Sequence, residues 1–176
     1  AALLFIPSLR SWFGADPPLP ERRVLAVLPF LPIGGRAEDQ DFCSGMVEVL
    51  TAKLTEVRNF QGPLAVIASR EVAARRVESP SDAARLLGAT LAITGSFQRE
   101  GAQVRIWANL VDTRTLENVR SSTLDLGSRT GRGLQERVLA EVIGMLGIAL
   151  NPAASRAIAS EQGGNAEAYD LVLQAK

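Results

Sequence analysis

The stretch Val24-Leu25-Ala26-Val27-Leu28-Pro29-Phe30 decides the fold class, because it is a continuous run of apolar residues. A strand covered on both faces has such a run, whereas a strand with one wet face alternates polar and apolar residues. The run therefore predicts a central strand of the parallel type. Proline has no backbone N–H for a ladder, so we expect the strand to stop at Pro29. A loop should follow over Pro32-Ile33-Gly34-Gly35.

Beyond this loop, helix and strand patterns alternate. Acidic residues open a helix, where the positive end of the helix dipole favours them. Its predicted buried stripe comprises Phe42, Met46, Val49, Leu50, Leu54 and Val57. Residues 63–68 predict a second short strand, after which Ser69 is suited to cap a short helix. Ser79-Pro80-Ser81-Asp82 is typical of a further helix start, with Ser79 as the N-cap and Gly88 as the left-handed stop.

From residue 91 onward the hydrophobic period changes to two. Alternation over residues 91–98 and 104–111 predicts a β-hairpin with one apolar face, joined by a turn at Glu100-Gly101. A second turn leads to a weaker strand near residues 119–126, and a core-facing helix follows over residues 134–149, ended by Asn151-Pro152. The order predicts an α/β fold. We expect a mixed sheet of about five strands, a right-handed parallel βαβ unit first and antiparallel hairpins after it, packed with helices.

The two ends of the chain differ in character from its middle, which predicts three segments: residues 1–21, 22–150 and 151–176. Residues 1–6 are apolar, which fits the last turns of a membrane helix, an arm packed on its own domain or a signal-peptide remnant. Asp16-Pro17-Pro18-Leu19-Pro20 predicts a stiff spacer. Residues 165–176 form an amphipathic pattern that is too short for an isolated stable helix.

Composition excludes several kinds of chemistry. The 176 residues include no histidine and one cysteine, with 19 basic and 19 acidic side chains. Catalysis by a Ser-His-Asp or Cys-His set, a His-ligated metal and an internal disulfide are therefore excluded. Balanced charge provides no global field for nucleic acid. We expect no catalytic residue, metal, cofactor or nucleic-acid partner, and Cys43 is either a small core-edge side chain or a reactive thiol.

Two groups of residues are candidates for binding. Open α/β sheets bind ligands beyond the carboxyl ends of their parallel strands. The candidate ligand-binding residues at that position are Gly34, Asp41, Ser44, Ser69 and Arg70. On the hairpin, Trp107 and Arg105 point to the face opposite the apolar one, where Trp107 is either an interaction residue or core beneath a second helical layer. Gly95 in a strand favours the close approach of another backbone, and Ser96 lacks the context of a nucleophile.

An ordered set of segments resembles a bacterial family. The segments are Val27-Leu28-Pro29-Phe30, Asp41-Phe42-Cys43-Ser44-Gly45-Met46 with Glu48, Ala84-Arg85-Leu86-Leu87-Gly88-Ala89, Gly95-Ser96-Phe97 and Leu110-Val111-Asp112-Thr113. Together they are similar to the TolB amino-terminal-domain-like modules, related to FlgO-type domains, over about residues 23–150. Residues from Asn165, with Ala168, Tyr169 and Leu173, are similar to the start of a tetratricopeptide array. Cys43 and Ile93-Thr94 depart from the family pattern.

The resemblance implies a module that is not an enzyme, within a larger bacterial signalling protein. Such modules follow a kinase, nucleotide-cyclase or DNA-binding effector domain, often with a membrane helix between. We therefore expect a membrane-anchored sensor or protein-interaction module on the extracytoplasmic (periplasmic) side, which links a membrane helix to helical repeats. Arg10, Arg22 and Arg23 favour the cytoplasmic side instead. The alternatives are a small-ligand or nucleotide-binding domain and a structural cap on the repeats.

Overall fold

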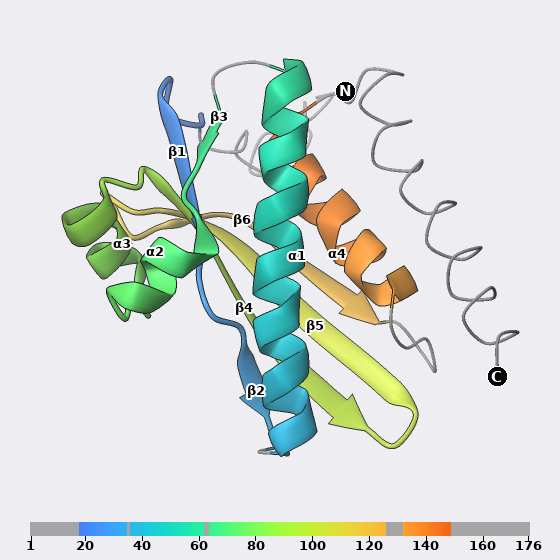
Figure 1. Cartoon of the computed structure of the whole chain (residues 1–176). Helices are drawn as coiled ribbons and strands as arrows, with labels where there is room; N and C mark the ends of the chain where they lie inside the picture. Colours follow the sequence, from blue (N-terminus) through green and yellow to red (C-terminus); the bar gives the residue numbers. More distant parts are fainter. Residues whose placement is uncertain (1–17, 35, 62–63, 126–131, 149–176) are drawn as a thin grey trace, which may run out of the picture.

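The computed structural model describes residues 18–34, 36–61, 64–125 and 132–148 (Figure 1). The elements, in chain order, are β1 (Arg23–Val27), β2 (Leu31–Ile33), α1 (Ala37–Gln61), β3 (Leu64–Val66), α2 (Ser69–Ala74), α3 (Pro80–Leu87), β4 (Leu91–Glu100), β5 (Gln103–Asp112), β6 (Asn118–Asp125) and α4 (Arg132–Met145). The expected segments 1–17 and 149–176 lie outside the described residues. Their assignment as a membrane-proximal stub and as a repeat stays a prediction.

The strands form a six-stranded mixed sheet in the order β3-β1-β4-β5-β6, with β2 paired to β4 as well. β1 runs parallel to β3 and β4, whereas β4, β5 and β6 are antiparallel neighbours. The first four residues of the apolar run, Val24 to Val27, thus lie in the central parallel strand β1, and the predicted mixed α/β fold is confirmed.

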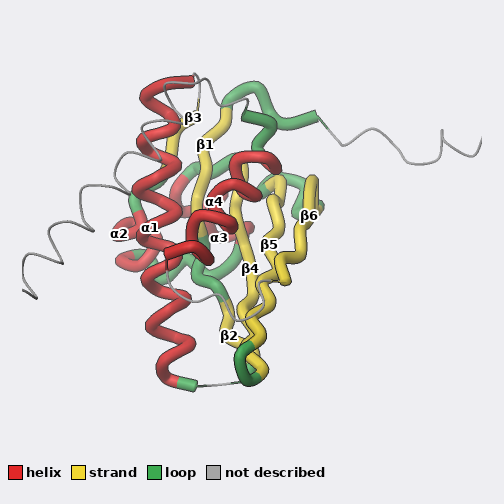
Figure 2. Tube along the Cα trace, turned by 90° about the vertical axis from the view of Figure 1, so that its right-hand side faces the viewer, coloured by secondary structure: helices red, strands yellow, loops and turns green. Residues whose placement is uncertain are grey.

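The predicted loop at residues 32–33 is wrong, because Leu31–Ile33 forms the short strand β2, which is one strand more than the five expected. β1 pairs with only the first three residues of the ten-residue β4. Leu28 still donates a backbone hydrogen bond to Ile93, and the chain beyond Phe30 then pairs with β4 again, with Leu31 opposite Ser96. Figure 2 shows β1 and β2 in succession along the same side of β4.

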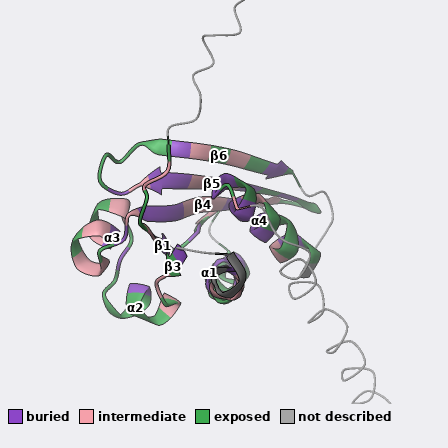
Figure 3. Cartoon of the chain, turned by 90° about the horizontal axis from the view of Figure 1, so that it is seen from above, coloured by how far each residue is buried: buried purple, intermediate pink, exposed green. Residues whose placement is uncertain are grey.

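Helices pack on both faces of the parallel half of the sheet. The larger core cluster lies between the sheet and helices α1 and α4, and the smaller one joins β1 and β4 to α2 and α3. Seen from above, α2 and α3 lie on one side of β1 and β3, and α1 lies on the other (Figure 3). Alternation along β1 explains the two clusters, since Leu25 and Val27 enter the larger and Ala26 and Leu28 the smaller.

Phe30 packs closely against the backbone of Gly95 in the larger cluster. Phe30 is 1% exposed, and a Cβ atom at Gly95 would lie 2.6 Å from its Cδ1 atom and 2.6 Å from the carbonyl oxygen of Trp107. The close approach expected at this strand glycine is therefore present, although it involves a ring as well as a backbone. On α1, four residues of the predicted stripe are buried together with Cys43 and Val47, whereas Phe42 and Val49 are only half-buried.

The helix ends follow the predicted signals in part. The Ser79 hydroxyl accepts a hydrogen bond of 3.1 Å from the Asp82 backbone N–H, and Gly88 ends α3 with φ of 65°. Ser69 does not cap α2, because the carbonyl of Ala68 already accepts from the N–H of Glu71 and the helix begins one residue earlier. α4 ends at Met145 instead of near residue 149, since Gly147 takes a left-handed φ of 63°.

Candidate functional site

The half of the sheet made by β4, β5 and β6 has a second face that points away from α1 and α4. α2 and α3 reach only β1 and the start of β4, so the side chains on the rest of this face are half-buried or exposed. The residues of this open face form three cross-strand rows. They are Thr94, Asn109 and Ser121, then Ser96, Trp107 and Thr123, then Gln98, Arg105 and Asp125.

Strand β2 extends the open face by an apolar column. Leu31 lies opposite Ser96 and Ile33 opposite Gln98, and parallel partners present their side chains to the same face. Leu31 is 68% exposed and Ile33 is 46% exposed. Pro32 between them lies opposite the buried Phe97 and turns toward the other face. The open face therefore combines an apolar margin with a polar field.

Trp107 stands at the centre of this face. Its neighbours across the strands, Ser96 and Thr123, are small, so the half-buried indole ring is not enclosed. The guanidinium carbon of Arg105 lies 5.8 Å from the ring centroid, within cation–π range. The interpretation of Trp107 as core beneath a helix is therefore wrong, because the short helices α2 and α3 do not extend over β5.

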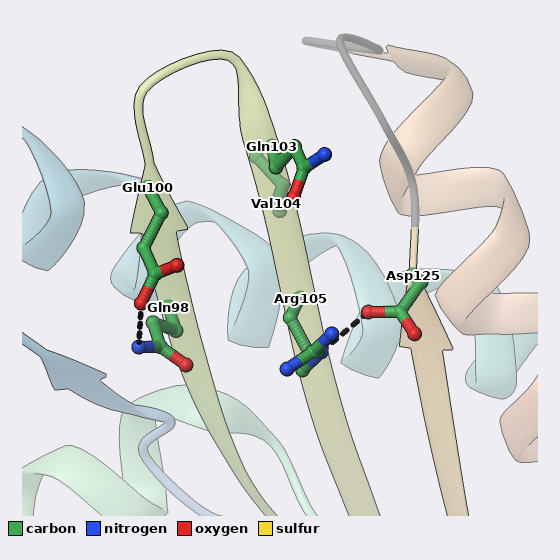
Figure 4. Close-up of a pocket in the computed structure, with 6 residues that line it drawn as sticks. All are labelled: Gln98, Glu100, Gln103, Val104, Arg105 and Asp125. Atoms are coloured by element: carbon green, nitrogen blue, oxygen red, sulfur yellow. Dashed lines mark hydrogen bonds and ion pairs between the residues drawn. The ribbon is translucent and has the colours of Figure 1, made fainter.

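A shallow cavity of about 360 Å³ lies at the hairpin end of the open face and is lined in part by Arg105 (Figure 4). Arg105 is ion-paired with Asp125, and this hydrogen-bonded carboxylate raises the pKa of the guanidinium. The amide nitrogen of Gln98 donates a hydrogen bond of 2.7 Å to the carboxylate of Glu100. The lining residues are Gln98, Glu100, Gln103, Val104, Arg105 and Asp125.

A second cavity, of about 160 Å³, lies between α1 and α2 and is here called the interhelix cavity. It is lined by Pro29, Phe30, Gln40, Cys43, Ser44, Val47, Glu48, Ser69, Val72 and Ala73. Ser44 and Ser69, two of the predicted ligand-binding residues, meet here from different helices. Gly34, Asp41 and Arg70 are exposed and do not line it.

The topology explains why the interhelix cavity forms at this place. In the sheet, β3 and β4 lie on the two sides of β1. After β1 and β2, the chain passes through α1 to β3, and it then crosses back through α2 and α3 to β4. The two helices therefore diverge on opposite faces just beyond the carboxyl end of β1, which is a topological switch point. Pro29 and Phe30, which follow β1, close the inner end of the cavity.

The thiol of Cys43 at the base of this cavity is not activated. Burial, followed by the charge of Asp39, raises the pKa of Cys43 to about 11. The thiol is therefore neutral near pH 7 and lacks the thiolate that nucleophilic chemistry requires. Asp39 is itself 3% exposed, and its carboxylate oxygen lies 2.9 Å from Nε of Arg99. That ion pair joins the first turn of α1 to the end of β4.

In the part of the chain that the structure describes, no group of three or more Cys, Asp or Glu side chains is placed to hold a metal ion. Among the same described residues, no helix has the length and hydropathy that crossing a bilayer requires.

Sequence reasoning missed the exposed apolar pair Leu31 and Ile33. A three-residue strand carries no periodicity, and Pro32 within it signals a loop. The Asp39–Arg99 pair was also missed, since its members are 60 positions apart. The one available signal was the alternation of β4, which continues well past the end of β1 and leaves room for a further partner strand.

No protein-family model matches the sequence. A curated protein of Rhizobium meliloti (strain 1021), named "Putative adenylate cyclase 3", is 28% identical over 167 residues, which are 93% of this chain. The chain spans 28% of the length of that relative. The whole relative is thus much longer than the region that the two proteins share.

Solved structures that the chain resembles include three bacterial proteins. Lipoprotein GNA1162 from Neisseria meningitidis is 17% identical, with a TM-score of 0.49 over 72% of this chain and 99% of that one. TolB from Acinetobacter baumannii is 14% identical, with a TM-score of 0.48 over 73% and 29%. The LpoB C-terminal domain from Salmonella enterica is 15% identical, with a TM-score of 0.39 over 60% and 82%.

A TolB structure is thus among the proteins that this chain resembles. The expected FlgO and tetratricopeptide relationships stay predictions. The described residues form a mixed α/β domain whose six-stranded sheet is packed with helices, and none of their helices covers the open face.

Proposed function

We propose that this chain is a non-catalytic protein-interaction module of a longer, membrane-associated bacterial signalling protein. The observation that carries the proposal is the open face of β4, β5 and β6 with its β2 margin. Trp and Arg dominate the binding energy of protein interfaces, and exposed apolar residues mark them. Leu31, Ile33, Trp107 and Arg105 bring these residue types together on one surface.

A partner protein docks on this face and not by adding a strand to β2. Pro32 has no backbone N–H, so the three-residue strand offers its outer side few groups for a new ladder. The side chains of Ser96, Asn109 and Thr123, by contrast, make no hydrogen bond within the described residues and are available to a partner. The docked surface is thus an apolar margin, a central indole and a polar rim.

Placement in a signalling protein is supported by the curated relative, which is named "Putative adenylate cyclase 3". This chain spans 28% of the length of that relative. We propose that the domain lies on the extracytoplasmic side and regulates an effector elsewhere in the parent protein. The parent's effector supplies any catalysis. The sequence expectation of helical repeats after residue 150 belongs to the same proposal.

Site-directed photo-crosslinking in the full-length parent tests the docking surface. A photoreactive residue at Thr123 on the open face should give one discrete protein adduct, whereas the same residue at the exposed Ser81 on α3 should not. The adduct should disappear with Trp107→Ala and with Leu31→Glu, each measured below its own melting temperature so that the domain is folded in both variants. An adduct that survives both substitutions contradicts the proposal. So does turnover of nucleotides, phosphoesters or peptides by the purified domain that depends on one polar side chain.

A second candidate function is small-ligand binding in the interhelix cavity. The observation that favours it is the convergence of Ser44 and Ser69 at the switch point beyond β1, where open α/β sheets bind ligands. The volume of about 160 Å³ suits a small molecule and is well below the space that nucleotide-sized ligands fill. In this role the module senses a ligand on one side of the sheet and contacts a partner on the other.

A further inference from the structure

We propose that the interhelix cavity binds a small organic cation, namely a primary amine joined to a single ring or short chain. The inference rests on the second candidate function, ligand binding in this cavity, and names the class of ligand. It excludes anions and nucleotides as the natural ligands.

The walls of the cavity divide into an apolar floor and a polar rim. Phe30, Val47 and Val72 are 1%, 8% and 2% exposed, and they provide the floor together with Cys43. A neutral thiol acts as a small apolar surface. Since the volume is about 160 Å³, this floor has room for one compact apolar group.

The rim provides acceptors for the head group of the ligand. Gln40, Ser44 and Glu48 come from one face of α1 at spacings of four residues, and Ser69 faces them from α2. The Ser44 hydroxyl donates its proton to the Gln40 carbonyl at 3.0 Å, so its lone pairs remain for a donor from the ligand. An ammonium group, with three donors and no acceptor, matches this set.

Charge decides between an amine and a neutral or anionic ligand. Glu48 is the acidic residue of the lining, which includes no Lys or Arg. Arg70 is exposed on α2 outside the lining, and Arg99 is occupied by Asp39. The carboxylates of Glu38 and Asp39 already occupy the first turn of α1, where they offset the positive end of its dipole. The cavity therefore presents net negative charge to a ligand.

Three probes of one shape and different charge test the inference on the full chain. Phenethylamine, phenethyl alcohol and phenylacetate each carry a two-carbon chain on a phenyl ring, and they differ in the charge of the end group. Isothermal titration calorimetry measures the affinity of each probe. We expect phenethylamine to bind at least about fivefold more tightly than the other two, as one partly exposed ion pair supplies. Its advantage should shrink as salt concentration rises.

Variants locate the site and its charge. Glu48→Gln should remove the amine preference while the melting temperature stays unchanged, and the matched control Glu136→Gln on the exposed side of α4 should keep it. Ala73→Trp should block all three probes by filling the cavity mouth. Equal binding of the three probes, or tighter binding of phenylacetate, overturns the amine assignment but leaves ligand binding intact. Failure of every probe, or binding that Ala73→Trp leaves unchanged, overturns both.

Discussion

Arg23, the first residue of β1, donates a hydrogen bond of 3.1 Å from Nη1 to the carbonyl oxygen of Leu146, just after α4. Arg120 on β6 donates a second bond, of 2.6 Å, to the carbonyl of Met145. The last carbonyls of a helix lack intrahelical donors, and cations there also complement the helix dipole. Leu19 and Ile148 pack on the same core cluster. The start of β1 and the end of α4 thus lie side by side.

The first prediction concerns this link. Arg23→Ala should lower the free energy of unfolding by about 1 to 2 kcal/mol, because it removes a charge-assisted hydrogen bond and leaves the carbonyl of Leu146 without this donor. Amide hydrogen exchange of residues 146–148 should accelerate selectively. Arg22→Ala is the matched control, since the side chain of Arg22 is exposed and its loss should change stability by less than about 0.5 kcal/mol. Equal exchange rates in the two variants would show that the link carries no stability.

The second prediction concerns Gly95. Gly95→Ala should destabilise the fold by about 2 to 4 kcal/mol, because its Cβ would overlap the Phe30 ring and the carbonyl of Trp107. Gly144→Ala in α4 is the control, since no atom lies within 4 Å of its added Cβ. That change should stabilise by about 0.5 to 1 kcal/mol through helix propensity. Urea denaturation measures the unfolding free energy of both variants. A Gly95→Ala variant as stable as the native chain would contradict the close packing of Phe30 on Gly95.

The third prediction concerns the ion pair of Asp39 and Arg99. Asp39→Asn should cost about 1 to 2 kcal/mol, because the carboxylate is 3% exposed and its loss removes the charged partner of a half-buried guanidinium. A double-mutant cycle with Arg99→Met should yield a coupling energy of about 1 kcal/mol. Asp41→Asn, two positions away and exposed, should have little effect. Additive effects of the two changes would rule out the coupling.

The fourth prediction concerns the pH dependence of stability through Cys43. Its pKa rises from 9.0 to about 11 on folding, so the folded state holds the proton more tightly. The stabilisation is complete below pH 9 and is lost as the pH rises through about 11. Relative to Cys43→Ala, the native chain should lose about 2 kcal/mol between pH 8 and pH 11.

Thiol labelling provides an independent check of the same group. An alkylating reagent should modify native Cys43 slowly at pH 8, since the side chain is 1% exposed and protonated, and rapidly in denaturant. Fast labelling of the native protein would mean that the thiolate forms in the fold.

Local patterns in the sequence were sufficient for the larger elements. The uninterrupted apolar run at residues 24–30 indicated burial on both faces, and alternation at residues 91–98 indicated a hairpin. β2 was missed because its pairing depends on the excess length of β4, which is a property of the assembled sheet. The three residues of β2 carry no pattern that indicates an unpaired stretch of β4 beside Ser96.

The candidate sites depended on arrangement more than on residue type. Ser44 and Ser69 come together because each lies on a helix that starts beyond a parallel strand, as the topology rule predicts. Asp41 does not join them, since Gln40, Ser44 and Glu48 share a helix face that excludes it. The sequence left two environments open for Trp107, and α2 and α3, of six and eight residues, are too short to cover it on β5.

Pro32 has a consequence for the behaviour of the domain in concentrated solution. An exposed apolar strand at a sheet margin is a template on which further chains assemble into fibrils. By withholding a backbone donor between Leu31 and Ile33, this proline interrupts such templating while the flanking side chains stay exposed. The apolar surface that we propose for a partner is therefore kept without the aggregation hazard that normally accompanies exposed apolar strands.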